Sequence, residues 1–307
     1  MASTQHDVLV EELTPGGRRP TPDVKPSPEG LVAARAAMEE FALPIDAGVA
    51  SEAASLGGVP GIWFRPDGTE DIDAAIIYFH GGGFMFGSPS NTGHVTARLA
   101  KAAGIPAFSV DYRLSWQAPF PAPVEDALAV YRALLDTGLE PECIALAGDS
   151  AGGGLAISTL VAARDAGLAL PSCAYTTSAF TDCTVSGESV TGIDDPIVSG
   201  DGLLMLADAY LDGADPTDPL ASPLFADLHG LPPLLLHVGG REALLDDTIR
   251  VADRARAAGV EVTVEVIDGA IHIWQYFGPD LPETVASDAD AGRFLTAHTR
   301  LIPRPGG

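Results

Sequence analysis

The chain has 307 residues, of which 46% are hydrophobic, and its 42 acidic against 17 basic residues give a formal net charge of −25. Such a hydrophobic fraction excludes a disordered protein, and the length allows one or two domains with a large buried core. The strong acidity argues against nucleic acid as a partner and equally against an anionic membrane surface, because both require clustered Lys and Arg.

The first 45 residues are expected to form an N-terminal arm with a cap helix. The opening MASTQHDVLV lacks the basic and apolar stretches of a signal peptide. Five prolines between Thr14 and Gly30 predict an extended segment, and the helix formers of residues 31–42 predict a short helix. No apolar run reaches about 18 residues, so no membrane insertion is expected. Three cysteines without a CxxC pair fit the reduced thiols of a cytoplasmic protein.

From about residue 60 onward, apolar strands and amphipathic helices alternate. We expect strands at residues 74–79, 105–110, 143–147, 234–238 and 262–267, and helices at 94–103, 124–136, 155–166, 248–258 and 286–299. This alternation indicates an α/β fold with a mostly parallel central sheet and helices on both faces. Residues 184–223 interrupt the rhythm with turn signals and an apolar helical piece near 203–211, which predicts a small helical cap inserted into a main domain over residues 46–307.

A serine motif, Gly148-Asp149-Ser150-Ala151-Gly152, stands between a predicted strand and a predicted helix. This is the G-x-S-x-G pattern in its strand–turn–helix context. The tight turn leaves no room for bulk two residues before or after the serine, and it presents the hydroxyl at a helix N-terminus. A phosphate-binding loop would need a following lysine, and a dinucleotide fingerprint would read G-x-G-x-x-G. Ser150 is therefore the predicted nucleophile, and Asp149 is expected to hydrogen-bond to nearby backbone.

Three successive glycines follow the predicted strand at residues 74–79, in the run His80-Gly81-Gly82-Gly83-Phe84. Their unshielded N–H groups can converge on one oxygen, which is what an oxyanion hole requires. We expect the N–H groups of Gly82, Gly83 and Ala151 to form this hole. His80 is expected to hold the loop by hydrogen bonding rather than to act as a base.

Together, HGGGF and GDSAGG resemble the hormone-sensitive-lipase-like family of α/β-hydrolase esterases. The resemblance extends over residues 74–294 and includes Asp111-Tyr112-Arg113-Leu114, followed by Pro119-Phe120-Pro121-Ala122. Where the family continues with Ala-Pro-Glu after that leucine, this chain has Ser115-Trp116-Gln117, a departure in the local pocket wall. The resemblance implies the α/β-hydrolase fold and a serine esterase that needs neither cofactor nor metal and acts on a small-molecule ester.

The base and the acid are expected after the serine, because the chain order in this fold is serine, acid, histidine. Of the seven histidines, His272 follows a late predicted strand and its Asp268-Gly269 turn, and Ile271-His272-Ile273-Trp274 resembles the corresponding family segment. The family places its acid 30 residues earlier, which is Glu242 here, and a glutamate can orient the base. Asp246 stays open as the alternative acid, with helix capping as its other role.

The predicted function is a serine carboxylesterase that hydrolyses short- to medium-chain esters, or lactones, through an acyl-enzyme on Ser150. The side chains expected to line an apolar substrate pocket are Phe84, Trp116, Met205, Ile273 and Trp274. Two alternatives stay open: an amidase or peptidase with the same triad, and a receptor of the same fold that binds a small molecule without turning it over. The oligomeric state also stays open, a homodimer included.

Overall fold

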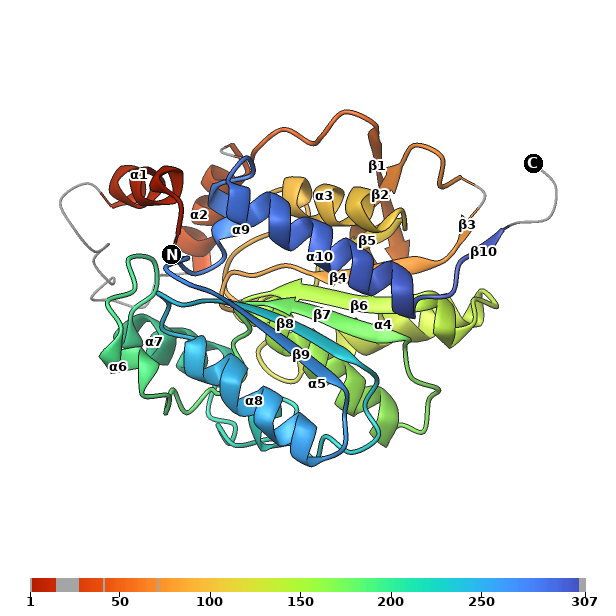
Figure 1. Ribbon diagram of the computed structural model, residues 1–307. Helices are drawn as coiled ribbons and strands as arrows, with labels where there is room; N and C mark the ends of the chain where they lie inside the picture. The colour runs from red at the N-terminus through yellow and green to blue at the C-terminus, as the bar shows by residue number, and fades with distance from the viewer. Residues whose placement is uncertain (1, 15–27, 41, 71, 304–307) are drawn as a thin grey trace.

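An eight-stranded sheet runs through the middle of the molecule in the computed structural model, which describes residues 2–14, 28–40, 42–70 and 72–303 (Figure 1). The strand order is β1-β2-β5-β4-β6-β7-β8-β9. The strands are β1 (Val49–Leu56), β2 (Val59–Pro66), β4 (Ala75–Phe79), β5 (Ala107–Val110), β6 (Ile144–Asp149), β7 (Cys173–Thr177), β8 (Leu234–Gly239) and β9 (Val262–Ile267). From β5 to β9 all pairs are parallel, whereas β1 and β2 pair antiparallel. The predicted fold class is thereby confirmed.

Helices cover both faces of this sheet (Figure 1). One face carries α3 (Gly93–Ala103), α9 (Trp274–Phe277) and α10 (Pro282–His298); the other carries α4 (Ala122–Asp136), α5 (Ala151–Asp165) and α8 (Leu245–Ala257). Two short strands, β3 (Ile72–Asp73) and β10 (Ile302–Pro303), pair beside the main sheet, and two 3₁₀ turns are η1 (Pro141–Cys143) and η2 (Pro223–Phe225).

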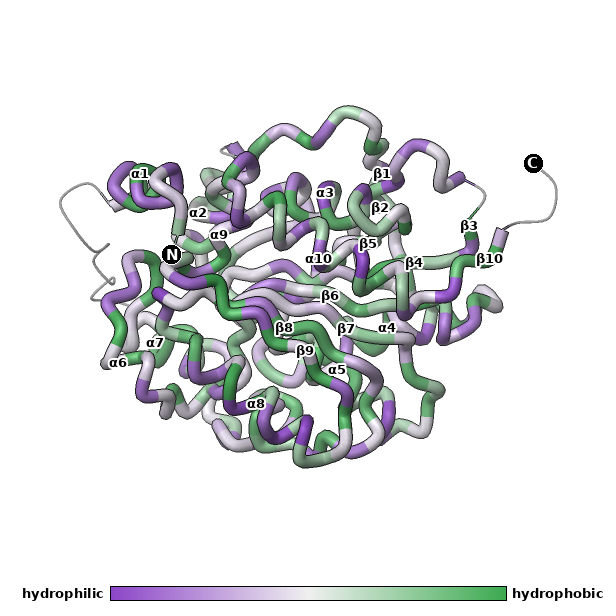
Figure 2. The backbone as a smooth tube through the Cα atoms, in the orientation of Figure 1, coloured by the Kyte–Doolittle hydropathy of each residue, from purple (hydrophilic) through white to green (hydrophobic). Residues whose placement is uncertain are grey.

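The apolar core has two halves because alternate residues of a strand point to opposite faces. In β4, Ile76 and Tyr78 belong to the apolar cluster beneath α3 and α10, whereas Ile77 and Phe79 belong to the cluster beneath α4 and α5. All five residues of β4 are buried, which explains why the strand reads as a continuous apolar run. The surface helix α8 differs from this buried strand, because hydrophobic and hydrophilic residues alternate along it (Figure 2).

Four further helices gather where the parallel strands end (Figure 1). They are α1 (Thr4–Leu13), α2 (Pro28–Glu40), α6 (Ser189–Gly192) and α7 (Gly200–Leu211). Leu31 of α2, Ala209 of α7 and Met85 form one buried apolar cluster, so the N-terminal segment and the insertion pack against each other. None of the helices in the described ranges is both long and apolar enough to span a bilayer.

Several elements differ from the sequence-based expectation. The β1–β2 hairpin was not predicted, because β1 reads VASEAASL and is largely exposed, without the apolar alternation that marks a strand. The prediction also lacked β7 and α1. Helix α2 begins at Pro28 rather than at residue 31, since proline suits a first helical turn. Of the segment expected to be extended, residues 15–27 lie outside the described part of the chain.

Candidate active site

Ser150 occupies a sharp turn between β6 and α5. Its φ is 52° and its ψ −121°, a conformation that non-glycine residues rarely adopt. The glycines on either side are required by contact distance: a Cβ on Gly152 would lie 1.9 Å from the carbonyl oxygen of Phe79, and one on Gly148 would lie 2.3 Å from the carbonyl oxygen of Gly152. The Ser150 N–H donates to the Thr177 carbonyl oxygen at 2.9 Å. The motif glycines therefore permit the close packing that holds the strained serine.

His272 lies in the turn between β9 and α9, at the same end of the sheet. Its Nε2 is 3.0 Å from Ser150 Oγ, within hydrogen-bond reach, although 122 residues separate the two in sequence. The imidazole is buried, with 3% of its residue surface exposed. The structure thus brings the predicted nucleophile and the predicted base into the geometry that proton transfer requires.

Glu242 follows β8 and faces the other side of the imidazole. Its Oε1 lies 3.6 Å from His272 Nδ1, which is longer than a hydrogen bond but close enough to attract the imidazolium when His272 is protonated. Its Oε2 accepts the Gly239 N–H at 2.9 Å and the Ser178 hydroxyl at 2.8 Å. These two donors fix the carboxylate, so that its second oxygen is directed at the ring.

Ser178 links the loop that carries Glu242 to the loop that carries His272. Besides donating to Glu242, its Oγ accepts the N–H of Ile273, the residue after His272, at 3.1 Å. Sequence reasoning missed this serine, because a single hydroxyl in a turn carries no motif. Ser178 has a φ of 52° and is therefore, like Ser150, a non-glycine residue with positive φ.

Charges around the imidazole favour its protonated form. Burial by itself lowers the pKa of His272, but the carboxylate of Glu242, with those of Asp195 and Asp149 farther off, raises the pKa above its ordinary value of 6.5. An acceptor of the serine proton that is stabilised as a cation in this way is a stronger base than an isolated buried histidine.

Asp246, the alternative acid, contacts the cap rather than the imidazole. Its Oδ2 accepts the N–H of Ser189 in α6 at 2.8 Å. Asp195, another acidic residue of the insertion, contacts the loop that carries Glu242. It is fully buried, and its Oδ2 accepts the N–H of Ala243, the residue after Glu242, at 2.8 Å. In the sequence, Asp195 belongs only to the turn signals of residues 184–223, and its contact with the loop of Glu242 is visible only in three dimensions.

The glycine loop after β4 lies against the serine turn. Gly82 and Gly83 have φ of 113° and 62°, which only glycine adopts readily. Asp149, as expected, bonds to nearby backbone: its carboxylate accepts the Gly81 N–H at 3.1 Å, and it also accepts the Tyr78 hydroxyl at 2.6 Å. Ala151 opens α5 directly after the serine. The predicted oxyanion donors thus come from two adjoining segments that Asp149 ties together.

His80 braces this loop. Its Nδ1 lies 2.8 Å from the Gly81 carbonyl oxygen, and its ring stacks on Tyr112 with centroids 4.4 Å apart. Burial lowers the pKa of His80 to about 4, so the ring is neutral and Nδ1 is the donor. This arrangement agrees with the structural role expected from the sequence.

The residues expected to line a substrate pocket differ in burial and in packing partners. Phe84 is buried and stacks on Tyr210 of α7 at 3.8 Å between centroids, and the Trp116 indole N–H donates to the Met85 carbonyl oxygen. Met205 on α7 and Ile273 are half-buried. Trp274 is fully buried in an apolar cluster with Val10 of α1, so its side chain packs under the N-terminal helix.

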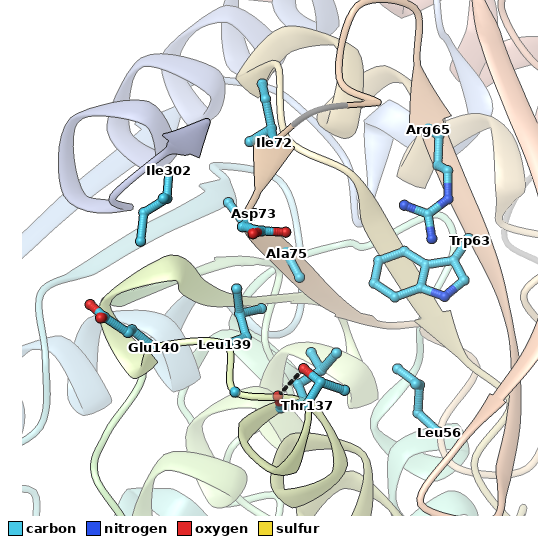
Figure 3. Close-up of a pocket in the computed structure, with 13 residues that line it drawn as sticks. Leu56, Trp63, Arg65, Ile72, Asp73, Ala75, Thr137, Leu139, Glu140 and Ile302 are labelled. Carbon is cyan, nitrogen blue, oxygen red and sulfur yellow. Dashed lines mark hydrogen bonds between the residues drawn. The ribbon is translucent and has the colours of Figure 1, made fainter. Parts of the chain in front are cut away.

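A hollow of about 340 Å³ opens at the other end of the sheet (Figure 3). Trp63, Arg65 and Glu140 contribute to its wall, and the Arg65 guanidinium lies 4.3 Å from the centre of the Trp63 ring. Ala75, the first residue of β4, also lines it, whereas Ser150 follows the last residue of β6. This hollow is therefore separate from the serine site. No group of three His, Cys, Asp or Glu residues in the described ranges is arranged to hold a metal ion.

Comparisons with known proteins agree with this geometry. A family model described as alpha/beta hydrolase fold matches residues 76–276. An acetyl-hydrolase of Streptomyces hygroscopicus is 40% identical over 247 residues, which cover 80% of this chain and 82% of that protein. A carboxylesterase of Mycobacterium tuberculosis is 32% identical over 260 residues, or 80% of each chain. The crystal structure of an esterase from the bacterial hormone-sensitive lipase family superimposes with a TM-score of 0.90 at 40% identity, covering 98% of this chain and 100% of that one.

Proposed function

The chain belongs to the alpha/beta hydrolase family and is a carboxylic ester hydrolase, and we propose that it cleaves short- to medium-chain esters through Ser150, His272 and Glu242. The observation that carries this proposal is the 3.0 Å contact between Ser150 Oγ and His272 Nε2 at the carboxyl end of the parallel sheet. A serine hydroxyl becomes an effective nucleophile when an adjacent base accepts its proton.

In the first half of the reaction, Ser150 Oγ attacks the ester carbonyl carbon while His272 Nε2 takes the hydroxyl proton. The carbonyl oxygen becomes an oxyanion, which accepts hydrogen bonds from the N–H groups of Gly82, Gly83 and Ala151. Each such donor is worth about 3–4 kcal/mol to the transition state. The carbon–oxygen bond to the alcohol then breaks, His272 returns the proton to the leaving oxygen, and the acyl group stays on the serine.

In the second half, water replaces the alcohol. His272 takes a proton from the water as its oxygen attacks the acyl carbon, and the same proton returns to Ser150 Oγ when the carboxylic acid leaves. Throughout, the Glu242 carboxylate stabilises the imidazolium and keeps Nε2 directed at the serine. The 3.6 Å separation in the free enzyme is one that can tighten when substrate binds.

The cap supports a preference for small acyl groups. A Cβ on Gly83 would lie 2.5 Å from the side chain of Leu206 in α7, so this leucine lies directly against the proposed oxyanion loop. The neighbouring Phe84 and Tyr210 rings are stacked and buried. Bulky apolar side chains packed this close to the proposed oxyanion loop support a preference for short to medium chains over long ones.

Hydrolysis of p-nitrophenyl esters from C2 to C16 tests the proposal, with Ser150→Ala beside the wild type. We expect activity to peak at short chains and to vanish in the variant. Ser109→Ala is the matched control, since Ser109 is also buried but lies on β5, and it should retain full activity. Full turnover by Ser150→Ala, or a maximum at C16, would contradict the proposal. A matched p-nitroanilide, which only an amidase cleaves well, separates the two reactions.

We further propose that residues 1–45 form an arm with a cap helix on a catalytic domain over 46–307, and that residues 184–223 complete the cap. A cytoplasmic location is part of the same proposal. It is supported by Cys143, Cys173 and Cys183, which are all buried free thiols. Recovery of the native protein in a membrane or secreted fraction would contradict that location.

A further inference from the structure

The backbone on both sides of His272 is held by side chains from distant parts of the chain. On one side, the N–H of Ile273 donates to Ser178 Oγ at 3.1 Å. On the other side, the N–H of Ile271 donates to His6 Nε2 at 3.3 Å. His6 lies in α1, 265 positions earlier in the sequence. A residue of the N-terminal helix therefore contacts the peptide group that directly precedes the proposed base.

His6 can serve in this place only as an acceptor. The Ile271 N–H is a donor, so His6 Nε2 must carry a lone pair and the ring proton must be on Nδ1. The imidazole is fully buried, and burial lowers the pKa of His6, more strongly than the carboxylates of Glu283 and Asp7 raise it. The ring is therefore neutral at pH 7, and the acceptor is present.

Helix α1 is seated firmly enough to hold His6 in position. Ser3 caps the helix by accepting the His6 N–H at 3.2 Å, and both its N–H and its hydroxyl donate to Glu283 at the start of α10. Val10, one turn after His6, is buried with Ile271 and Trp274 in a common apolar cluster. The helix is thus attached to the body of the protein beside the loop that presents His272.

That loop requires such support because its backbone is strained. Ile273, a β-branched residue, has φ 44°, in the left-handed region that such side chains rarely adopt. Strained conformations persist only where surrounding contacts hold them. Without the bond to Ile271, one of the two amide contacts that flank His272 is lost, and relaxation of the loop would shift His272 Nε2 relative to Ser150 Oγ.

We propose that His6 is a positioning residue, which holds the Ile271 peptide and so keeps His272 Nε2 within reach of Ser150 Oγ. This inference rests on the proposed function, in which His272 is the base. It assigns the N-terminal helix a part in the chemical step, in addition to packing over the body of the protein.

The test compares two substitutions that differ by one methylene. In His6→Gln the amide oxygen reaches the place of Nε2 and can accept the Ile271 N–H, whereas in His6→Asn it falls short, near the place of Nδ1. With p-nitrophenyl butyrate, we expect His6→Asn to lower kcat about tenfold with KM within about threefold of wild type. We expect His6→Gln to stay within about threefold of wild type in both. Val8→Ala, on the exposed face of the same helix, should leave both constants unchanged.

A second readout follows the serine itself. The rate at which phenylmethanesulfonyl fluoride modifies Ser150 depends on how well His272 is placed, and it should fall in His6→Asn in parallel with kcat, with His6→Gln close to wild type. Equal kcat in wild type and both variants, or equal losses in Gln and Asn, would overturn the role of His6. Ser150→Ala is assayed alongside: if it keeps activity, the proposed function fails, and if it is inactive while His6→Asn is fully active, only the role of His6 fails.

Discussion

Replacing Ser178 by alanine should slow the reaction, although Ser178 is not one of the proposed reacting groups. The variant loses the hydroxyl that donates to Glu242 Oε2 at 2.8 Å and accepts the Ile273 N–H at 3.1 Å. Glu242 keeps its bond from the Gly239 N–H, so the carboxylate is loosened and not released. The half-buried Ile273 N–H next to the proposed base loses its acceptor.

The magnitude follows from these two contacts. A hydrogen bond to a charged group contributes about 1.5–3 kcal/mol, and each 1.4 kcal/mol is a factor of ten in rate. If the whole contribution acts in the transition state, kcat/KM falls by roughly 10- to 100-fold. The unpaired Ile273 N–H also lowers the free energy of unfolding, by about 1–3 kcal/mol. We expect most of the kinetic loss in kcat, because neither contact involves the substrate.

The assay is steady-state hydrolysis of p-nitrophenyl butyrate, with urea unfolding of the same preparations. Ser109→Ala provides the comparison, since it removes an equally buried hydroxyl, which has no hydrogen-bond partner among the described residues, from β5. A Ser178→Ala enzyme with kcat within about twofold of wild type would refute the reasoning. So would a loss found entirely in KM, since that would place the hydroxyl in substrate binding.

Three further outcomes follow from the site and its surroundings. Gly152→Ala should destabilise the protein by about 1–3 kcal/mol or more in urea unfolding, because its Cβ would lie 1.9 Å from the Phe79 carbonyl oxygen; an unchanged midpoint would contradict this. Glu242→Gln should lower the midpoint of the acid limb of kcat, because the carboxylate raises the pKa of His272 while burial lowers it; an unchanged or higher midpoint would contradict the electrostatic account. Burial raises the pKa of Asp247 to about 7, so the folded state binds a proton that the unfolded chain releases near pH 4, and this contribution to stability is lost as pH rises from about 4 to 7. Asp247→Asn should therefore lose less stability than wild type between pH 5 and 8, and equal losses would show that this carboxyl is not responsible.

The sequence predicted those parts of the site whose residues lie close together along the chain. The serine turn and the glycine loop are short motifs, because their tight backbones exclude side chains at fixed positions. The order of serine, acid and histidine also follows from the fold. Glu242 lies just before α8 and Asp246 in its first turn, four residues later, and only the three-dimensional arrangement distinguishes the carboxylate that faces His272 from the one that faces the cap.

The contacts that support the site were not predictable in this way. Ser178, Asp195 and His6 are single polar residues whose partners lie 48 to 265 positions away. Trp274 illustrates the same limit, since an apolar residue near the histidine suggested a pocket wall, but its side chain packs beneath α1. That helix was not predicted, so nothing in the sequence indicated that this position would be covered.

The most direct test of the account is the rate of p-nitrophenyl butyrate hydrolysis by Glu242→Ala and Asp246→Ala beside wild type and Ser150→Ala. The account predicts no activity without Ser150, a loss of at least about 100-fold without Glu242, and most of the activity retained without Asp246. Activity that survives Glu242→Ala largely intact but disappears in Asp246→Ala would contradict it and move the acid to Asp246.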